Sequence, residues 1–380
     1  MHRSRYVARL CAVVAAGVIF CQVGVVQAST EDLAPMLANI RTAQNFPGAA
    51  AVVMKDGRIV AQGATGVRRL GEGAAITADN RFAVGSVTKR MTVYLVARLV
   101  EDGKLSTDLK LGEVLKDISM RDEYKGVTLG QLLAFTGGIA GYERIGPRIT
   151  PELFDTAGTL AEREAKFAQH VLNLAPAGAI GREAVYSNAS YMLAALMVSR
   201  VMDKPYMDLM AEYVFRPLSM SRAGWGRPWQ ADRKDEPWLH VARPDGHAPE
   251  PDMERPPEVL FRAAGNAHMS VADMARFAQE DLLARRGKGV LLKSPKLWTT
   301  IGASRELDPG DRTVHAGGTP WLAACYAVWP LHGMVAAIAV NGGSPDDAAC
   351  KAFVKEVETR FAPMTTSMGT NIRNAVRQSR

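Results

Sequence analysis

Strand-like segments occur only near the two ends of this chain, and a long helical region separates them. Residues 49–54 and 59–63 have the pattern of a β-hairpin closed by a tight turn at Asp56-Gly57, and three further strand-like segments lie at 313–317, 322–329 and 334–340. An isolated hairpin has too little partner surface to be stable, so we expect the two ends to meet in one sheet. The predicted fold class is α+β, with a five-stranded antiparallel sheet flanked by helices and a mostly helical subdomain.

The composition, with 47% hydrophobic and 22% charged residues, is that of a soluble globular protein and excludes a disordered chain or a multi-span membrane protein. The net charge of +7 is concentrated at the termini. Residues 1–28 and 362–380 each contain three arginines and no acid, which leaves +1 for the body. A nucleic-acid partner is not expected, because phosphate binding needs a concentrated basic face. Residues 362–380 are predicted to form a flexible basic tail.

The first 28 residues have the pattern of a secretory signal peptide. Arginines up to Arg9 precede an apolar segment at 10–26, and Ala28 stands before a predicted cleavage at Ser29. An uncleaved membrane anchor is the alternative. With cleavage we expect a periplasmic or secreted protein that keeps no stable membrane span.

Two cysteines, Cys325 and Cys350, remain after removal of this segment. Export permits a disulfide between them, but both lie in apolar segments where buried free thiols are equally natural, so both alternatives stay open. The sequence contains no His-x-x-x-His or Cys-x-x-Cys pair, and no metal site is predicted.

Ser86 begins a long apolar helix predicted at 86–100, and Lys89 follows on the same helix face. Apolar surroundings favour the neutral form of an amine, which could then take the proton of Ser86. The alternative is a capping serine and a surface lysine, because Ser-x-x-Lys alone is a weak motif.

Tyr186-Ser187-Asn188 precedes a second apolar helix, predicted at 189–202. In an extended segment, Tyr186 and Asn188 point to the same side. Tyr186 could shuttle a proton and Asn188 could bind a substrate amide. An aromatic anchor followed by a helix cap is the structural alternative.

His315-Ala316-Gly317-Gly318-Thr319 forms a glycine-rich strand end. Such a strand end allows a ligand to approach the backbone, and a free N–H there can serve an oxyanion hole. His315 and Gly317 would face the same side. A histidine in a turn is the alternative.

Taken in this order, the three motifs resemble the serine β-lactamase and penicillin-binding-protein superfamily. The similar branch includes class C β-lactamases, DD-carboxypeptidases, D-aminopeptidases and β-lactamase-like esterases. The resemblance covers about residues 33–361 and implies a β-lactamase/transpeptidase-like fold. It suggests one catalytic domain at 29–361, with an α/β part at 33–110 and 290–361 and a helical part at 111–289.

The resemblance implies that Ser86 is the acylated nucleophile, that Lys89 accepts its proton, and that Tyr186 activates the leaving group or the deacylating water. Asn188 would hold the substrate amide, and the N–H groups of Ser86 and Gly318 would form the oxyanion hole. Binding residues on the strand would be His315, Gly317 and Gly318. We therefore expect a cofactor-free serine hydrolase for a small-molecule or peptidoglycan-derived substrate, either an ester or a D-amino-acid peptide or amide. A β-lactamase, or a non-catalytic protein that binds penicillin or peptidoglycan, is the alternative.

Three features depart from the family pattern. His315 stands where β-lactamases usually carry lysine, so we expect carboxylate recognition that weakens as pH rises through neutrality. Phe135-Thr136-Gly137-Gly138 replaces the usual His-Thr-Ser-Gly, and the sequence shows no substitute for its hydrogen bonds. Residues 225–257 are predicted to be a long surface loop, with a possible hairpin at Asp245-Gly246 and with His240 and His247 placed where they could touch substrate.

Overall fold

The computed structural model describes residues 30–142, 158–228, 235–243, 246–249, 261–302, 312–343 and 347–362. The predicted signal peptide, residues 363–380 of the predicted tail and much of the predicted loop lie outside these ranges. Within these ranges, no helix has the length and apolar character needed to cross a membrane.

The main sheet brings the two ends of the chain together. Its strand order is β1-β3-β2-β11-β10-β9. The bounds are β1 Glu31–Asp32, β2 Gly48–Lys55, β3 Arg58–Gly66, β9 Thr313–Thr319, β10 Leu322–Trp329 and β11 Met334–Val340. β2 and β11 pair antiparallel at the centre of the sheet, so the predicted meeting of the N- and C-terminal strands is confirmed.

The predicted number of strands was too low by one. The five predicted strands pair antiparallel, but β1 adds a sixth strand, which runs parallel to β3 at the sheet edge. β1 has only two residues, Glu31 and Asp32, and both are charged. A segment so short and polar has no apolar alternation, so the sequence gives no sign of it.

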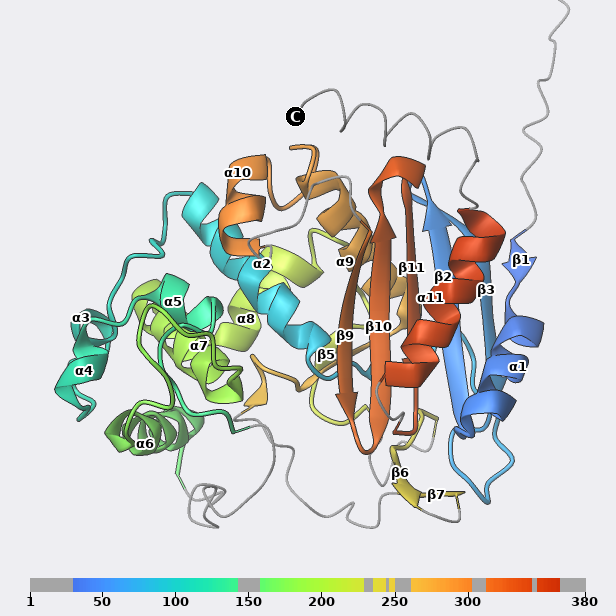
Figure 1. Ribbon diagram of the computed structural model, residues 1–380, viewed down its shortest axis with the longest axis horizontal. Helices are drawn as coiled ribbons and strands as arrows, with labels where there is room; N and C mark the ends of the chain where they lie inside the picture. The colour runs from blue at the N-terminus through green and yellow to red at the C-terminus, as the bar shows by residue number, and fades with distance from the viewer. Residues whose placement is uncertain are drawn as a thin grey trace, which may run out of the picture.

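Successive residues of β2 point to opposite faces of the sheet and enter two separate cores. Ala49, Ala51 and Val53 join the core beneath α1 (Ala34–Gln44) and α11 (Ala348–Phe361). The residues between them, such as Val52, join the core on the other face. Helices α2 (Val87–Glu101) and α9 (Val271–Ala284) pack on that second face (Figure 1).

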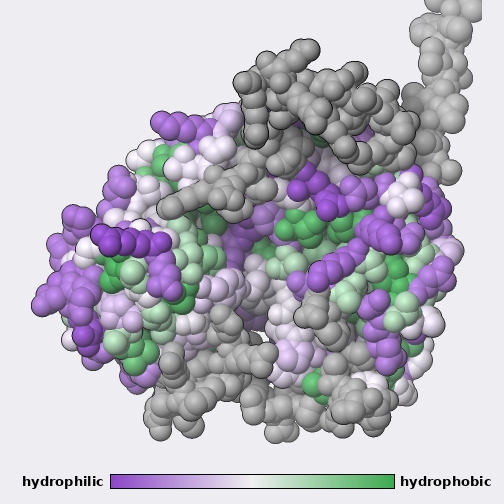
Figure 2. Space-filling view, in the orientation of Figure 1, coloured by the Kyte–Doolittle hydropathy of each residue, from purple (hydrophilic) through white to green (hydrophobic). Residues whose placement is uncertain are grey.

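A mostly helical region lies on the far side of α2 from the sheet (Figure 1). It contains α3 Leu111–Val114, α4 Asp122–Lys125, α5 Leu129–Leu133, α6 Leu160–Asn173, α7 Asn188–Met202, α8 Tyr206–Met210 and a π-helical turn at Ala211–Phe215. Every residue of α7 from Ala189 to Val198 is buried, as its uniformly apolar sequence predicts. Figure 2 shows mostly hydrophilic residues over α3 and α4, and a hollow between the helical region and the sheet.

Shorter elements connect the two regions. They are β4 Phe82–Ala83, β5 Gly224–Trp225, β8 Ala267–Met269, the hairpin of β6 His240–Arg243 and β7 Gly246–Pro249, α10 Pro295–Leu297, a π-helical turn at Trp298–Gly302 and a 3₁₀ turn at Pro330–His332. β4, β8 and β5 form a three-stranded sheet. β4 leads directly to the start of α2, so this small sheet fixes where α2 begins.

The predicted loop at 225–257 contains the β6–β7 hairpin at the predicted place. His240, however, is fully buried, which corrects its placement at the surface. Its Nε2 accepts the Leu70 N–H at 3.0 Å, and its Nδ1 lies 2.8 Å from the Asn341 carbonyl oxygen. These contacts join distant segments, so His240 holds the hairpin against the sheet instead of facing substrate. The side chain of His247 lies outside the described residues.

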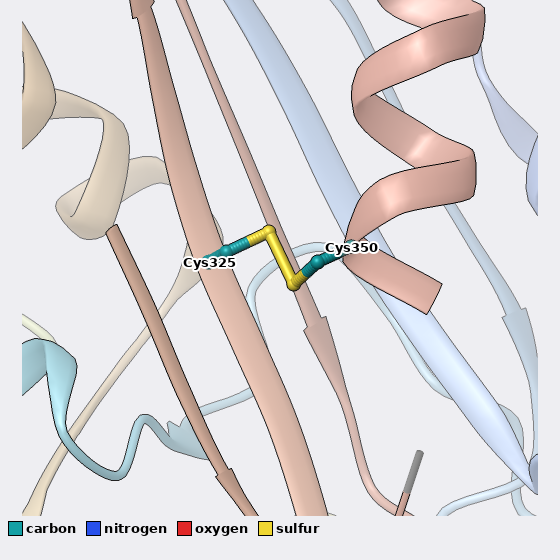
Figure 3. Close-up of a disulfide and its surroundings, with 2 residues drawn as sticks. All are labelled: Cys325 and Cys350. Atoms are coloured by element: carbon teal, nitrogen blue, oxygen red, sulfur yellow. A yellow bond between two sulfur atoms is a disulfide. The ribbon is translucent and has the colours of Figure 1, made fainter. Parts of the chain in front are cut away.

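A disulfide joins Cys325 of β10 to Cys350 of α11, with a Cα–Cα distance of 6.1 Å (Figure 3). This resolves the alternative that the sequence left open in favour of a bridge. Because α11 covers one face of the sheet, the bond fastens that helix to the strand beneath it.

Candidate active site

A sharp turn from β4 into α2 presents Ser86. Gly85 has a φ of +52°, in the left-handed region that favours glycine, and Ser86 is the N-cap residue of α2. Ser86 is half-buried, whereas Lys89, one helical turn later, is only 5% exposed. The surface lysine considered as the alternative is therefore wrong.

The structure brings Ser86, Lys89 and Tyr186 into direct contact. Lys89 Nζ donates to Ser86 Oγ at 3.0 Å and to the Ala264 carbonyl at 2.6 Å. The Tyr186 hydroxyl shares a hydrogen bond with Ser86 Oγ at 2.8 Å. One serine oxygen thus meets both an amine and a phenol. No local pattern in the sequence predicts the contact of Lys89 with Ala264.

Two aromatic rings surround the ring of Tyr186 and the amine of Lys89. The Phe135 ring centroid lies 4.9 Å from that of Tyr186 and 5.2 Å from that of Tyr191. Lys89 Nζ lies 4.9 Å from the Tyr186 ring centroid and 5.8 Å from the Tyr191 centroid. The segment that departs from the family pattern thus contributes an aromatic contact to the site.

Asn188 is the first residue of α7, directly after the N-cap Ser187. Its side-chain Nδ2 donates to the Tyr142 carbonyl at 2.8 Å, and its backbone N–H donates to Gly141. The capping role belongs to Ser187, whose Oγ accepts the Ser190 N–H. Since an amide nitrogen carries two hydrogens, the Tyr142 contact uses one of them.

Gly317 lets the backbone of β9 approach Ser86 closely. A Cβ atom on Gly317 would lie 2.5 Å from the Ser86 nitrogen and 2.3 Å from the Val84 oxygen, so a side chain there would collide with backbone. Gly318, the next residue, is exposed and lies on the edge strand of the sheet. The close approach of Gly317 sets this end of β9 beside the turn at Gly85 and Ser86.

His315 does not face the site as a cation. Although 26% of its side chain is exposed, Nε2 itself is buried and lies 3.7 Å from Asp281 Oδ2. Burial, with the positive charges of Arg90 and Arg285, lowers the pKa of His315 to about 4 against the opposing effect of Asp281. The imidazole is then already neutral at neutral pH. The expected loss of carboxylate recognition as pH rises through neutrality is therefore wrong.

Asp281 is the centre of a buried polar network behind the site. Oδ1 accepts from Arg90 Nη2 at 2.9 Å, Tyr94 hydroxyl at 2.7 Å and Trp298 Nε1 at 2.7 Å. Burial alone would raise the pKa of Asp281, but nearby positive charges, Arg90 first, hold it well below its usual range. Sequence analysis missed this network. The available signal was Arg90 within an apolar helix, because a buried cation needs a buried acid.

Among the residues that the structure describes, no group of His, Cys, Asp and Glu side chains could hold a metal ion.

Comparisons with known proteins agree with this architecture. The family model described as Beta-lactamase matches residues 33–359. The chain is 28% identical over 331 residues to penicillin-binding protein 4 of Amycolatopsis lactamdurans, covering 80% of this chain and 83% of that protein. It is 28% identical over 226 residues to esterase EstB of Burkholderia gladioli, covering 53% of this chain and 55% of that protein.

Solved structures confirm the predicted β-lactamase/transpeptidase-like fold. D-alanine carboxypeptidase AmpC from Burkholderia cenocepacia superposes with a TM-score of 0.65 at 20% identity, covering 86% of this chain and 97% of that one. A class C β-lactamase from Rhodobacter sphaeroides gives 0.63 at 18% identity, covering 85% and 98%. The fold and the family match lead to one conclusion: the chain belongs to the β-lactamase family.

Proposed function

We propose that this protein is an exported serine hydrolase that forms an acyl-enzyme through Ser86 on an ester or a D-amino-acid peptide or amide. The observation that carries the proposal is the position of Ser86 Oγ, 3.0 Å from Lys89 Nζ and 2.8 Å from the Tyr186 hydroxyl. Both distances are within the range needed for proton transfer during nucleophilic attack.

In this mechanism Ser86 Oγ attacks the substrate carbonyl and passes its proton to the Lys89 amine. The N–H groups of Ser86 and Gly318 stabilise the oxyanion. Tyr186 delivers a proton to the leaving group, which departs as an alcohol or amine, and the proton that Lys89 took from Ser86 replaces it on Tyr186. Water then attacks the acyl-enzyme and gives a proton to the Lys89 amine, and that proton passes to Ser86 Oγ as the acyl bond breaks and the acid leaves.

The environment of His315 favours a substrate without a carboxylate at that position. Its Nε2 is turned toward Asp281 inside the protein, and its lowered pKa of about 4 leaves the ring neutral at pH 7. A neutral, inward-facing ring offers a carboxylate no charge-assisted hydrogen bond. Neutral esters are therefore the preferred substrates in this proposal, ahead of carboxylate-bearing β-lactams.

The test uses residues 29–380 with a neutral p-nitrophenyl ester and, separately, with a penicillin. Absorbance measures turnover, and intact-protein mass spectrometry detects a covalent adduct. We expect ester turnover that Ser86→Ala lowers by roughly 10³-fold or more without unfolding. Ser106→Ala, an exposed serine in a loop, is the matched control and should keep full activity.

Other results would indicate other functions. Ester turnover unchanged in Ser86→Ala would refute the assignment of the nucleophile. A lasting Ser86-dependent penicillin adduct without ester turnover would indicate a penicillin-binding protein, and rapid loss of the drug would indicate a β-lactamase. The absence of both turnover and adduct would favour a non-catalytic binding protein.

A further inference from the structure

Phe135 occupies a backbone position that normally belongs to glycine. After α5, the Thr136 N–H bonds to the Gln131 carbonyl at 2.9 Å and the Phe135 N–H bonds to the Leu132 carbonyl at 3.2 Å. These two bonds form the Schellman motif that ends many helices. The residue at its left-handed position is Phe135, with a φ of +62°. Glycine is usual there because a side chain strains this conformation.

The strained residue has two contacts with the segment that carries Tyr186. The Phe135 carbonyl accepts the Val185 N–H at 2.9 Å, directly before Tyr186. The Phe135 ring packs against the Tyr186 ring at 4.9 Å with an interplanar angle of 32°. Backbone and side chain of one residue therefore both act on the position of Tyr186.

Tyr186 needs such support because it is 41% exposed at the end of an extended segment. An exposed ring keeps one rotamer only where neighbours restrict it. Its hydroxyl must stay 2.8 Å from Ser86 Oγ, and Lys89 Nζ lies over the same ring. Ser86 Oγ holds the hydroxyl end of the Tyr186 ring by a hydrogen bond, and the Phe135 ring packs against the Tyr186 ring.

We propose that Phe135 is a positioning residue, which holds Tyr186 against Ser86, and that its left-handed backbone is kept because it aims the aromatic ring at Tyr186. Strained backbone persists where the surrounding structure fixes it and is concentrated at functional sites. Glycine would form the same turn without strain but without the ring. The inference rests on the proposed function, since it assigns Tyr186 a part in the chemistry.

The experiment compares Phe135→Gly with Phe135→Tyr in the 29–380 protein. Glycine suits the left-handed turn, so Phe135→Gly should fold. We expect its kcat on the ester to fall about 10- to 100-fold with little change in KM, because misplacement of a catalytic group affects the chemical step. Its pH–rate profile should also shift. Phe135→Tyr, which keeps a ring, should restore kcat to within about threefold of the original protein.

A crystal structure of Phe135→Gly provides the readout that does not depend on turnover. We expect the distance from Tyr186 hydroxyl to Ser86 Oγ to lengthen, or the ring to occupy more than one conformer. Unchanged kcat, pH profile and distance would overturn the proposal and leave Phe135 a purely structural residue. If the parent protein hydrolyses no ester, the proposed function fails, but the crystallographic distance still decides whether Phe135 positions Tyr186.

Discussion

Lys89 and Arg90 are neighbours on α2, and both side chains are buried, but they serve different networks. Lys89 contacts the hydroxyl of Ser86 and the carbonyl of Ala264 beside the candidate active site. Arg90 pairs with the buried carboxylate of Asp281. Successive residues of an α-helix are rotated by about 100° around its axis, so the side chains of Lys89 and Arg90 enter different surroundings.

The two residues differ in the groups that they contact, which are a hydroxyl and a carbonyl for Lys89 and a carboxylate for Arg90. Arginine stays protonated, and its planar group suits a carboxylate, so Arg90 and Asp281 neutralise each other inside the protein. Lysine can lose its proton, and a hydroxyl partner allows proton exchange. We infer that Arg90 has a structural role, whereas Lys89, beside it on α2, takes part in the proposed chemistry.

The largest expected effect is on catalysis, from Lys89→Met. This change removes the proposed proton acceptor but keeps an unbranched buried side chain, so kcat/KM should fall by about 10²- to 10⁴-fold while thermal stability is kept. Steady-state ester hydrolysis measures kcat/KM, and a thermal melt measures stability. Lys89→Arg should not restore activity, because arginine cannot act as a base. A kcat/KM within tenfold of the parent for either variant would remove Lys89 from the chemistry.

Arg90→Met should have the opposite effect. It leaves Asp281 buried without its main partner, and breaking a buried pair costs about 3 kcal/mol or more of unfolding free energy. Urea unfolding measures this loss, and activity per folded molecule should stay within about tenfold. Arg98→Met, on the same helix but in a partly exposed pair with Asp102, should cost about 1 kcal/mol or less. Equal costs for the two arginine variants would contradict the structural role of Arg90.

The smallest expected effect is the pH dependence of stability that comes from His315. Its pKa of about 4 in the folded protein lies below the ordinary 6.5, so between these values the unfolded chain binds a proton that the folded protein does not. Stability should therefore fall as pH falls through this window, by at most about 3 kcal/mol. Urea unfolding at pH 7 and pH 4.5 should show a smaller change in His315→Phe. The same change in both proteins would show that His315 is not the group responsible.

The central strands were predictable because their patterns are local. Unbroken apolar segments bounded by turn residues gave β10 and β11 with the observed limits, 322–329 and 334–340. β1 was missed because its pairing with β3 depends on where two distant segments lie in space, and Glu31 and Asp32 have no strand pattern of their own. The same limit applies to His240, which is buried by contacts from Leu70 and Asn341.

The candidate site was predictable only in part. The contact between Ser86 and Lys89 follows from helical spacing, but the contact of Ser86 with Tyr186 joins segments a hundred residues apart and was reached only through the family resemblance. The neutral state of His315 depends on its burial and on the charges of Arg90 and Arg285, which are distant from each other and from His315 in the sequence. Turn rules predict glycine at position 135, so the role of Phe135 could not be found from local rules.

The pairing of β2 with β11 also determines the order in which the protein can fold. Of the strands in the described ranges, β11 is the last to be synthesised, yet it lies at the centre of the sheet, with Met334 opposite Lys55. Until it is added, β2 has an open edge and two apolar faces, a state that favours aggregation. Pairing of such distant segments makes folding slow, because a long loop must close first. The main sheet therefore cannot be completed before residue 340 has been synthesised.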